Sequence, residues 1–207
     1  MVINTNISAQ NGARLLSESS SKLSKSLARL SSGSKIVSPE DDAAGVAVSD
    51  RLTAQISRNK AAGNNLANAM SFTQTQDGFL NKVGKALGRM SELSIMSQEI
   101  TKSDSDRALY NTEFTNLAAF VTNSASKDFD GVSLFSSSSL GVTIDSEGNT
   151  FSMVGIDLST ASYTGATGAN ISTTSAAASA LTAVKSAITQ LASDRATIGA
   201  NLARINA

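Results

Sequence analysis

The C-terminal segment carries the pattern that most restricts how this chain can fold. Apolar side chains recur there at alternating steps of three and four residues, with Arg195 as a polar exception, at Leu181, Val184, Ile188, Leu191, Ile198, Leu202 and Ile205. This spacing predicts an amphipathic helix whose apolar stripe packs against other helices, as in a coiled coil. Each fully buried Leu or Ile contributes about 1.5–3 kcal/mol, so the stripe needs a partner surface.

A second repeat of the same kind lies in the middle of the chain. Its members are Leu66, Met70, Thr73, Asp77, Leu80, Gly84, Leu87 and Met90, which predict one long helix over about residues 40–100. The string Ser38-Pro39-Glu40-Asp41-Asp42 indicates where this helix begins. Ser38 is the expected N-cap, Pro39 suits the first helical position, and carboxylates are stabilised near a helix N-terminus.

Two further helices are expected before and after this one. Near the N-terminus, a one-sided stripe is formed by Leu16, Leu23, Leu27 and Leu30. Ser103, followed by Asp104 and Asp106, is the expected N-cap of a helix with an apolar face formed by Tyr110, Phe114, Leu117 and Val121. The two N-terminal carboxylates belong to that helix start rather than to a catalytic pair.

The segment between the last two predicted helices has a different period. From Asp130 onwards apolar residues alternate, with Val142 and Ile144 before the turn Ser146-Glu147-Gly148-Asn149 and Phe151 and Met153 after it, which predicts a β-hairpin. Residues 160–174 form a Ser/Thr/Gly/Ala-rich segment expected to be a loop. The predicted fold class is mainly α: an elongated rod of long antiparallel helices with coiled-coil-like packing plus a small β-hairpin region.

The composition excludes most catalytic chemistry. The 207 residues contain no Cys and no His, so an imidazole base, a thiolate, a disulfide and the usual zinc sites are impossible. Seventeen basic and seventeen acidic residues balance, which gives no reason to expect a nucleic acid or an anionic membrane as partner. The uncharged stretch 158–184 is too polar to span a membrane. We therefore expect neither an enzyme nor a bound cofactor.

The remaining candidate groups favour structural roles. Asp41 and Asp42 form a carboxylate pair, but general acid–base catalysis would need a partner group in a cleft, so a helix N-terminus is the preferred interpretation. Met70, Met90, Met96 and Met153 are interpreted as side chains that fill gaps between helices rather than as metal ligands.

Several strings resemble the N-terminal region of bacterial flagellins, in the order found in that family. They are Ile3-Asn4-Thr5-Asn6, Arg29-Leu30-Ser31-Ser32-Gly33, Asp41-Asp42-Ala43-Ala44-Gly45, Gln74-Thr75-Gln76-Asp77-Gly78-Phe79-Leu80 and Gly88-Arg89-Met90-Ser91-Glu92-Leu93. Arg195-Ala196-Thr197-Ile198-Gly199-Ala200 resembles the start of the C-terminal half of the family. The resemblance covers roughly residues 1–135 and 176–207.

The resemblance implies a subunit that polymerises with other flagellin subunits into the extracellular flagellar filament. Such a subunit is secreted through the flagellar type III export apparatus. Residues 1–40 would then be the inner-tube segment, 41–129 and 176–207 the helical outer tube, and 130–175 a short variable region. Flagellins usually continue with a second inner-tube helix, whereas this sequence stops at Ala207, so the stripe that begins at Leu16 is expected to lack a partner and to form a marginal helix.

The resemblance also implies a receptor-binding patch. Arg89, Leu93 and Glu113 match the patch by which Toll-like receptor 5 recognises flagellin, with Leu93 filling a small pocket between the two charged side chains. Residue chemistry alone favours a surface ion pair beside a core leucine, while the family match favours the receptor patch. Two alternatives to a filament subunit stay open: a hook–filament junction protein, and a truncated monomeric flagellin that acts only as a recognition ligand.

Overall fold

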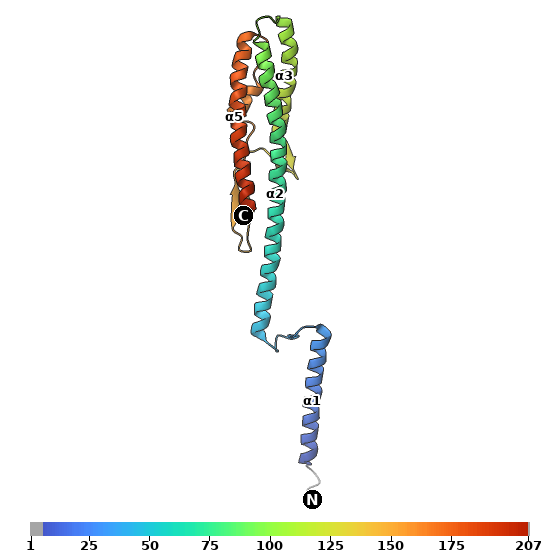
Figure 1. Ribbon diagram of the computed structural model, residues 1–207. Helices are drawn as coiled ribbons and strands as arrows, with labels where there is room; N and C mark the ends of the chain where they lie inside the picture. Colours follow the sequence, from blue (N-terminus) through green and yellow to red (C-terminus); the bar gives the residue numbers. More distant parts are fainter. Residues whose placement is uncertain (1–5, 207) are drawn as a thin grey trace. The chain divides into compact units, whose positions relative to one another are not determined.

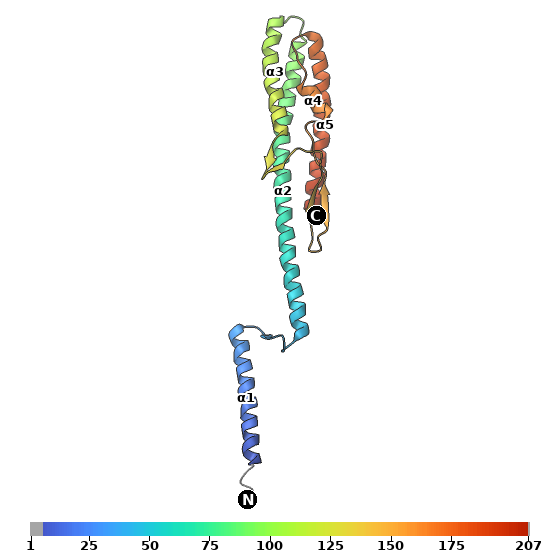
Figure 2. The same ribbon diagram turned by 180° about the vertical axis from the view of Figure 1, so that it is seen from behind.

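A computed structural model describes residues 6–206, and Figures 1 and 2 show it from opposite sides. The helices are α1 (Ile7–Ser32), α2 (Ala43–Ser97), α3 (Asp104–Ala125), α4 (Ala161–Thr167) and α5 (Thr174–Ile205). The strands form two antiparallel hairpins, β1 (Asp128–Phe129) with β2 (Val132–Ser133) and β3 (Leu140–Thr143) with β4 (Thr150–Met153). The predicted mainly α class is confirmed. The chain divides into two compact units, Met1–Ser57 and Arg58–Ala207.

In the first unit, α1 is a well-capped helix that buries none of its residues Ile7–Ser32. The Asn6 side chain accepts a hydrogen bond from the backbone N–H of Ala9 at 3.1 Å, and Gly33 ends the helix with a φ of 65°. This left-handed conformation is accessible to glycine at little cost. The predicted helix is confirmed, but its stripe lies open: Leu16, Leu23, Leu27 and Leu30 are 72%, 62%, 56% and 81% exposed.

The start of α2 lies later than the sequence suggested. Residues 38–41 form a turn in which the Asp41 N–H donates to the Ser38 carbonyl at 2.9 Å, so Ser38 and Pro39 precede the helix instead of opening it. Proline is favoured at the second position of such a turn and also in the first turn of a helix, so Pro39 alone did not distinguish the two structures. The cap is Asp42, whose carboxylate accepts from the Gly45 N–H at 2.8 Å.

In the second unit, α3 and α5 run antiparallel to the part of α2 that begins at Arg58, and the three helices lie side by side in both views (Figures 1 and 2). Their inner faces form one hydrophobic core, with Leu80, Leu87, Phe114 and Val184 among its fully buried members. Ser103 caps α3 as predicted, in a capping box with Asp106. Arg107 closes the α2–α3 connection because its guanidinium donates to the carbonyls of Ser97 and Glu99.

The buried stripe of α5 differs from the predicted one at every second position. Val184, Leu191 and Ile198 are buried as expected, but Leu181 and Leu202 are only half-buried and Ile188 is 36% exposed. The positions that alternate with them inside the core hold Ala180, Ala187, Asp194 and Asn201. Alanine permits close helix packing, and the two polar residues find partners inside the bundle, so small and polar side chains displace large ones from this seam.

The polar members of the two predicted stripes contact each other. Arg195 of α5 donates to Asp77 of α2 through Nε at 2.9 Å and through Nη2 at 3.4 Å. Both side chains remain partly exposed, at 45% and 36%, so this is a surface ion pair at the edge of the seam. The charged residue in each predicted apolar repeat, Asp77 in α2 and Arg195 in α5, is therefore paired with the other across the two helices.

The connecting region contains one predicted element and two unexpected ones. The β3–β4 hairpin is confirmed, with Val142 paired to Phe151. The β1–β2 hairpin was not predicted, and its turn holds Asp130 and Gly131 at φ values of 52° and 77°. The prediction of a loop over 160–174 is wrong in part, because α4 forms there: Tyr163 and Ala166 are fully buried against the bundle, and this burial outweighs the weak helix propensity of the segment.

Candidate functional site

A charged cluster bridges α2 and α3 on the surface of the second unit. Arg89 donates from Nε to Glu113 Oε1 at 2.7 Å and from Nη2 to Glu113 Oε2 at 3.2 Å, so the pair is bidentate. A third bond, at 2.9 Å, joins Arg89 Nη1 to Glu92. Glu113 raises the pKa of the Arg89 guanidinium, and Arg89 lowers the pKa of the Glu113 carboxyl, because each charge favours the other. The cluster can offer a planar, fixed ionic surface to a partner.

Leu93, the third residue of the predicted receptor patch, is not part of that surface. Arg89 and Glu113 side chains are 44% and 45% exposed, whereas Leu93 is fully buried in the core shared by α2 and α3. Four residues rotate by about 40° beyond a full helical turn, and this difference turns Leu93 toward the core while Arg89 stays at the surface. The expectation that Leu93 fills a receptor pocket therefore does not fit its burial, and the structure has the ion pair beside a core leucine that residue chemistry alone favoured.

Apolar side chains remain open on several helices. In the second unit Ile95, Leu109, Phe120 and Ile188 are 59%, 72%, 40% and 36% exposed, in addition to the leucine stripe of α1 in the first unit. Isolated exposed apolar residues are normal, but a continuous helical stripe is not. Apolar helix faces of this kind are typical of surfaces that pack against other protein surfaces.

Asp41 and Asp42 have separate structural roles in the first unit. Asp41 lies 2.8 Å from Lys25 Nζ and 3.3 Å from Arg29 Nη2, and its side chain is 4% exposed. The hydrogen bond from Lys25 is the main cause that lowers the pKa of the Asp41 carboxyl. Asp42 caps α2. Together these contacts fix the connection between α1 and α2, in agreement with the interpretation that the pair is structural.

Residues 6–206 contain no group of three or more potential metal ligands of the His, Cys, Asp and Glu types. Within the same range, no helix combines the length and the apolar character needed to cross a bilayer. Met90 and Met153 are buried in the core and Met70 and Met96 pack against it, as expected of side chains that fill gaps.

A buried polar pair joins α4 to α5, and a second bond within α5 supports it. The Tyr163 hydroxyl donates to Asp194 Oδ2 at 2.6 Å, and Gln190 donates to Asp194 Oδ1 at 2.9 Å. Desolvation and the neighbouring Asp194 raise the pKa of Tyr163, so its phenol stays protonated. Sequence reasoning missed this pair, because Asp194 lies outside the predicted apolar repeat and α5 carries other charged residues at its surface.

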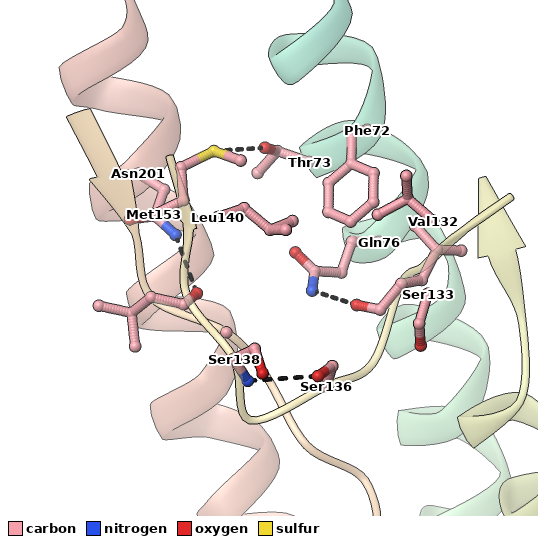
Figure 3. A pocket seen from close by; sticks show the side chains of 13 residues that line it. Phe72, Thr73, Gln76, Val132, Ser133, Ser136, Ser138, Leu140, Met153 and Asn201 are labelled. Carbon is pink, nitrogen blue, oxygen red and sulfur yellow. Dashed lines mark hydrogen bonds between the residues drawn. The ribbon is translucent and has the colours of Figure 1, made fainter. Parts of the chain in front are cut away.

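A cavity of about 190 Å³ lies in the second unit, between α2, α5 and the segments that follow β2 and β4 (Figure 3). Its wall combines apolar side chains, among them Phe72, Leu140 and Met153, with the carboxamides of Gln76 and Asn201. Sequence reasoning did not find it. Gln76 and Asn201 lie outside the two predicted apolar repeats, so the repeats gave no signal for their burial.

The fold and these surfaces define a class: a mainly α structural protein with extended helical faces for assembly. The family of the bacterial flagellin N-terminal helical region matches residues 3–140, and the chain belongs to the bacterial flagellins. The flagellar filament 41 kDa core protein of Borreliella burgdorferi is 43% identical over 117 residues, which cover 56% of this chain and 35% of that protein. B-type flagellin of Pseudomonas aeruginosa is 35% identical over 163 residues, or 78% of this chain and 33% of that protein.

A solved structure agrees with these relatives. The crystal structure of Bacillus cereus flagellin superposes with a TM-score of 0.62 at 25% identity, covering 70% of this chain and 85% of that chain. The chain spans about a third of the length of the first two relatives. Flagellins are structural proteins, so the prediction that the chain is not an enzyme is confirmed. Of the motifs that suggested the family, Ile3-Asn4-Thr5 lies outside the described residues.

Proposed function

We propose that this flagellin is a structural subunit of the bacterial flagellar filament and that its partners are other flagellin subunits. Relatives that bear the name of flagellar filament core protein support this function. The flagellar type III export apparatus would deliver the subunit to the extracellular filament, as the family resemblance implies. In this proposal residues 1–40 belong to the inner tube, 41–129 and 176–207 to the outer tube, and 130–175 to the variable region.

The observation that carries the proposal is the open stripe of α1. A helix of 26 residues that buries none of them gains no stabilisation from apolar burial, and an isolated helix of ordinary composition is marginal in water. Burial of Leu16, Leu23, Leu27 and Leu30 between neighbouring subunits would supply that stabilisation. On α5, the half-buried and exposed Leu181, Ile188 and Leu202 are the filament-packing candidates, since Val184, Leu191 and Ile198 are already used by the monomer core.

Polymerisation of the full chain tests the proposal, by sedimentation and electron microscopy, with and without an added flagellin C-terminal helix. The double change Leu23→Gln and Leu27→Gln removes the centre of the stripe. Its matched control is Ser21→Gln with Ala28→Gln, which places the same amides away from the stripe on the same exposed helix. We expect filaments from the unchanged chain and the control, in at least one of the two conditions, and none from the leucine variant. Equal assembly of both variants, or none by any form, would contradict the proposal.

We infer a second role, as a ligand of Toll-like receptor 5, from the cluster around Arg89. The bidentate pair with Glu113 is exposed, held in one geometry by three hydrogen bonds, and located on two adjacent helices. Fixed ionic groups of this kind lose little conformational freedom on binding. Leu93 would support the patch from beneath by packing, without touching the receptor.

Binding of the receptor ectodomain to the monomeric chain, measured by surface plasmon resonance, tests this role. Arg89→Ala and Glu113→Ala should each weaken binding by at least about tenfold, in the range of interface hot spots. Arg51→Ala, which removes an exposed arginine of the first unit, is the control and should change nothing. Undetectable binding by the unchanged chain, or unchanged binding by both cluster variants, would exclude the role.

A further inference from the structure

The cavity between α2 and α5 has an apolar part and a polar part. Phe72, Leu140 and Met153 form one side of the wall, and Gln76 and Asn201 contribute carboxamides from α2 and α5 (Figure 3). Leu134, Ser136 and Ser138 close it from the segment after β2. The hollow is therefore amphipathic, with apolar walls and a small number of polar groups, which is the composition of small-molecule sites in general.

The polar groups are incompletely satisfied by the protein. Gln76 is 5% exposed and its amide nitrogen donates to the Leu134 carbonyl at 2.7 Å, while Asn201 is 7% exposed and donates to the Val154 carbonyl at 3.5 Å. Among residues 6–206 no donor reaches Gln76 Oε1, yet this atom is not sealed from water. Figure 3 shows this oxygen directed toward the side of the wall where Leu140 and Met153 lie. This oxygen can accept a hydrogen bond from water or from a donor group of a molecule that occupies the cavity.

The wall also restricts the charge and size of an occupant. None of the thirteen residues that line the cavity is ionisable at neutral pH, so a charged ligand would lose its hydration without compensation. The volume of about 190 Å³ exceeds the roughly 150 Å³ of an apolar cavity known to hold benzene. An aromatic ring can pack against the Phe72 ring and the Met153 sulfur.

We propose that this cavity binds one small uncharged aromatic molecule of the phenol class. Its ring lies against Phe72, Leu140 and Met153, and its O–H donates to Gln76 Oε1. No covalent step is involved. Every lining residue lies in the second unit, so a single subunit contains the whole site.

A second hollow adjoins the cavity. A shallower groove of about 500 Å³ between the two hairpins shares Phe72, Val132, Leu140 and Met153 with it. The two hollows are therefore adjacent, and the groove also contacts Asn65 and Asn68 on α2.

Methionine-methyl NMR of the full chain provides the first test. Phenol, anisole and benzoate are titrated in turn, because anisole keeps the ring without the donor and benzoate adds a charge. We expect phenol to shift the Met153 methyl resonance saturably and to leave the Met90 signal, elsewhere in the core, unchanged. Anisole should bind roughly three- to tenfold more weakly, the effect of one neutral hydrogen bond, and benzoate not at all. Equal binding of phenol and anisole, or a Met153 signal that does not respond to phenol, would overturn the proposal.

A pair of variants identifies the acceptor. Gln76→Met keeps the side-chain length but removes the oxygen, and Gln74→Met makes the same change on the exposed side of α2. The first should abolish the preference for phenol over anisole and the second should preserve it. A preference that survives Gln76→Met would refute the assignment of Gln76, and the comparison of phenol with anisole on the unchanged chain holds even if that variant unfolds.

Discussion

α1 and α5 both carry stripes of large apolar residues at helical spacing, but they use them differently. α1 buries none of its 26 residues, whereas α5 buries a residue at every step of three or four from Ala177 to Ile205. The buried positions of α5 include alanine, aspartate and asparagine, and its large residues at 181, 188 and 202 lie at the edge. Size and apolarity of a stripe thus do not decide which helix enters a core. The availability of a partner within the unit decides it.

The largest expected difference between α1 and α5 is in the free energy of unfolding that is lost when one large apolar residue of the stripe is replaced by alanine. Ile198→Ala should lower the free energy of unfolding by about 2–5 kcal/mol. The Ile198 side chain is only 1% exposed, so its truncation leaves a cavity in the core. Leu23→Ala should change it by less than about 0.5 kcal/mol in the monomer, since Leu23 is 62% exposed. Chemical denaturation followed by circular dichroism measures both. Similar losses would show that α1 packs in the monomer after all.

A smaller effect is expected where the second unit is tightly packed outside its helices. A Cβ at Gly155 would meet the backbone carbonyl oxygens of Ser136 and Ser138 closer than van der Waals contact allows. Gly155→Ala should therefore cost about 1–3 kcal/mol in a thermal or urea melt. Gly165→Ala in α4 is the control, because nothing lies within 4 Å of its Cβ, and it should be neutral or stabilising. Equal effects would mean that the segment 136–138 moves freely.

The capping box of α3 should contribute less than the core. Ser103→Ala removes the acceptor for the Asp106 N–H and should cost about 1 kcal/mol in the second unit. Ser105→Ala changes the neighbouring exposed serine and serves as control. Hydrogen exchange of the first turn of α3 should rise in Ser103→Ala and not in the control. No difference would show that the cap is redundant with the Arg107 contacts.

The smallest effect is electrostatic and concerns one carboxylate in each unit. The pKa of Asp41 lies below its usual 3.8, so its contacts with Lys25 and Arg29 persist above that value and are lost as the pH falls through the lowered pKa. NMR titration of the carboxyl carbon should place the Asp41 midpoint below 3.8 and return it toward 3.8 in Lys25→Gln with Arg29→Gln. In the second unit, Arg89→Gln should move the Glu113 midpoint back up toward 4.5. Midpoints unchanged by these variants would contradict the pairing.

The elements that could be predicted from the sequence are those marked by local signals, namely helix caps, turn residues and the spacing of apolar residues. The α3 cap, the β3–β4 hairpin and the existence of α1, α2 and α5 follow from caps, turn residues and periodicity. The buried face of α5 could not be predicted in this way. Ala180, Ala187, Asp194 and Asn201 contribute little to an apolar pattern, and their burial depends on partners far along the chain. α4 was missed for the same reason, since Tyr163 and Ala166 depend on α3 and α5 for burial.

For the candidate site, too, the features that depend on distant parts of the chain could not be predicted from the sequence. Arg89 and Glu113 were paired correctly because charge complementarity is visible in the sequence once two helices are expected to be antiparallel. The burial of Leu93 depends on how α2 is rotated about its axis, and no single residue encodes that rotation. The cavity depends on the meeting of α2, α5 and two hairpins, of which one was not predicted.

The seam of α5 repeats every seven residues, and a repeat of that kind can in principle slide by one full period. Ala180 and Ala187 would then exchange contacts, and so would neighbouring members of the series Val184, Leu191, Ile198 and Ile205, at little cost in burial. Asp194 and Asn201 prevent this, because a shift would take the first from the Tyr163 hydroxyl and the second from the Val154 carbonyl. Each buried group left without a partner costs about 1–3 kcal/mol. The two polar residues thus fix the register of α5, that is, its axial position relative to the elements it packs against.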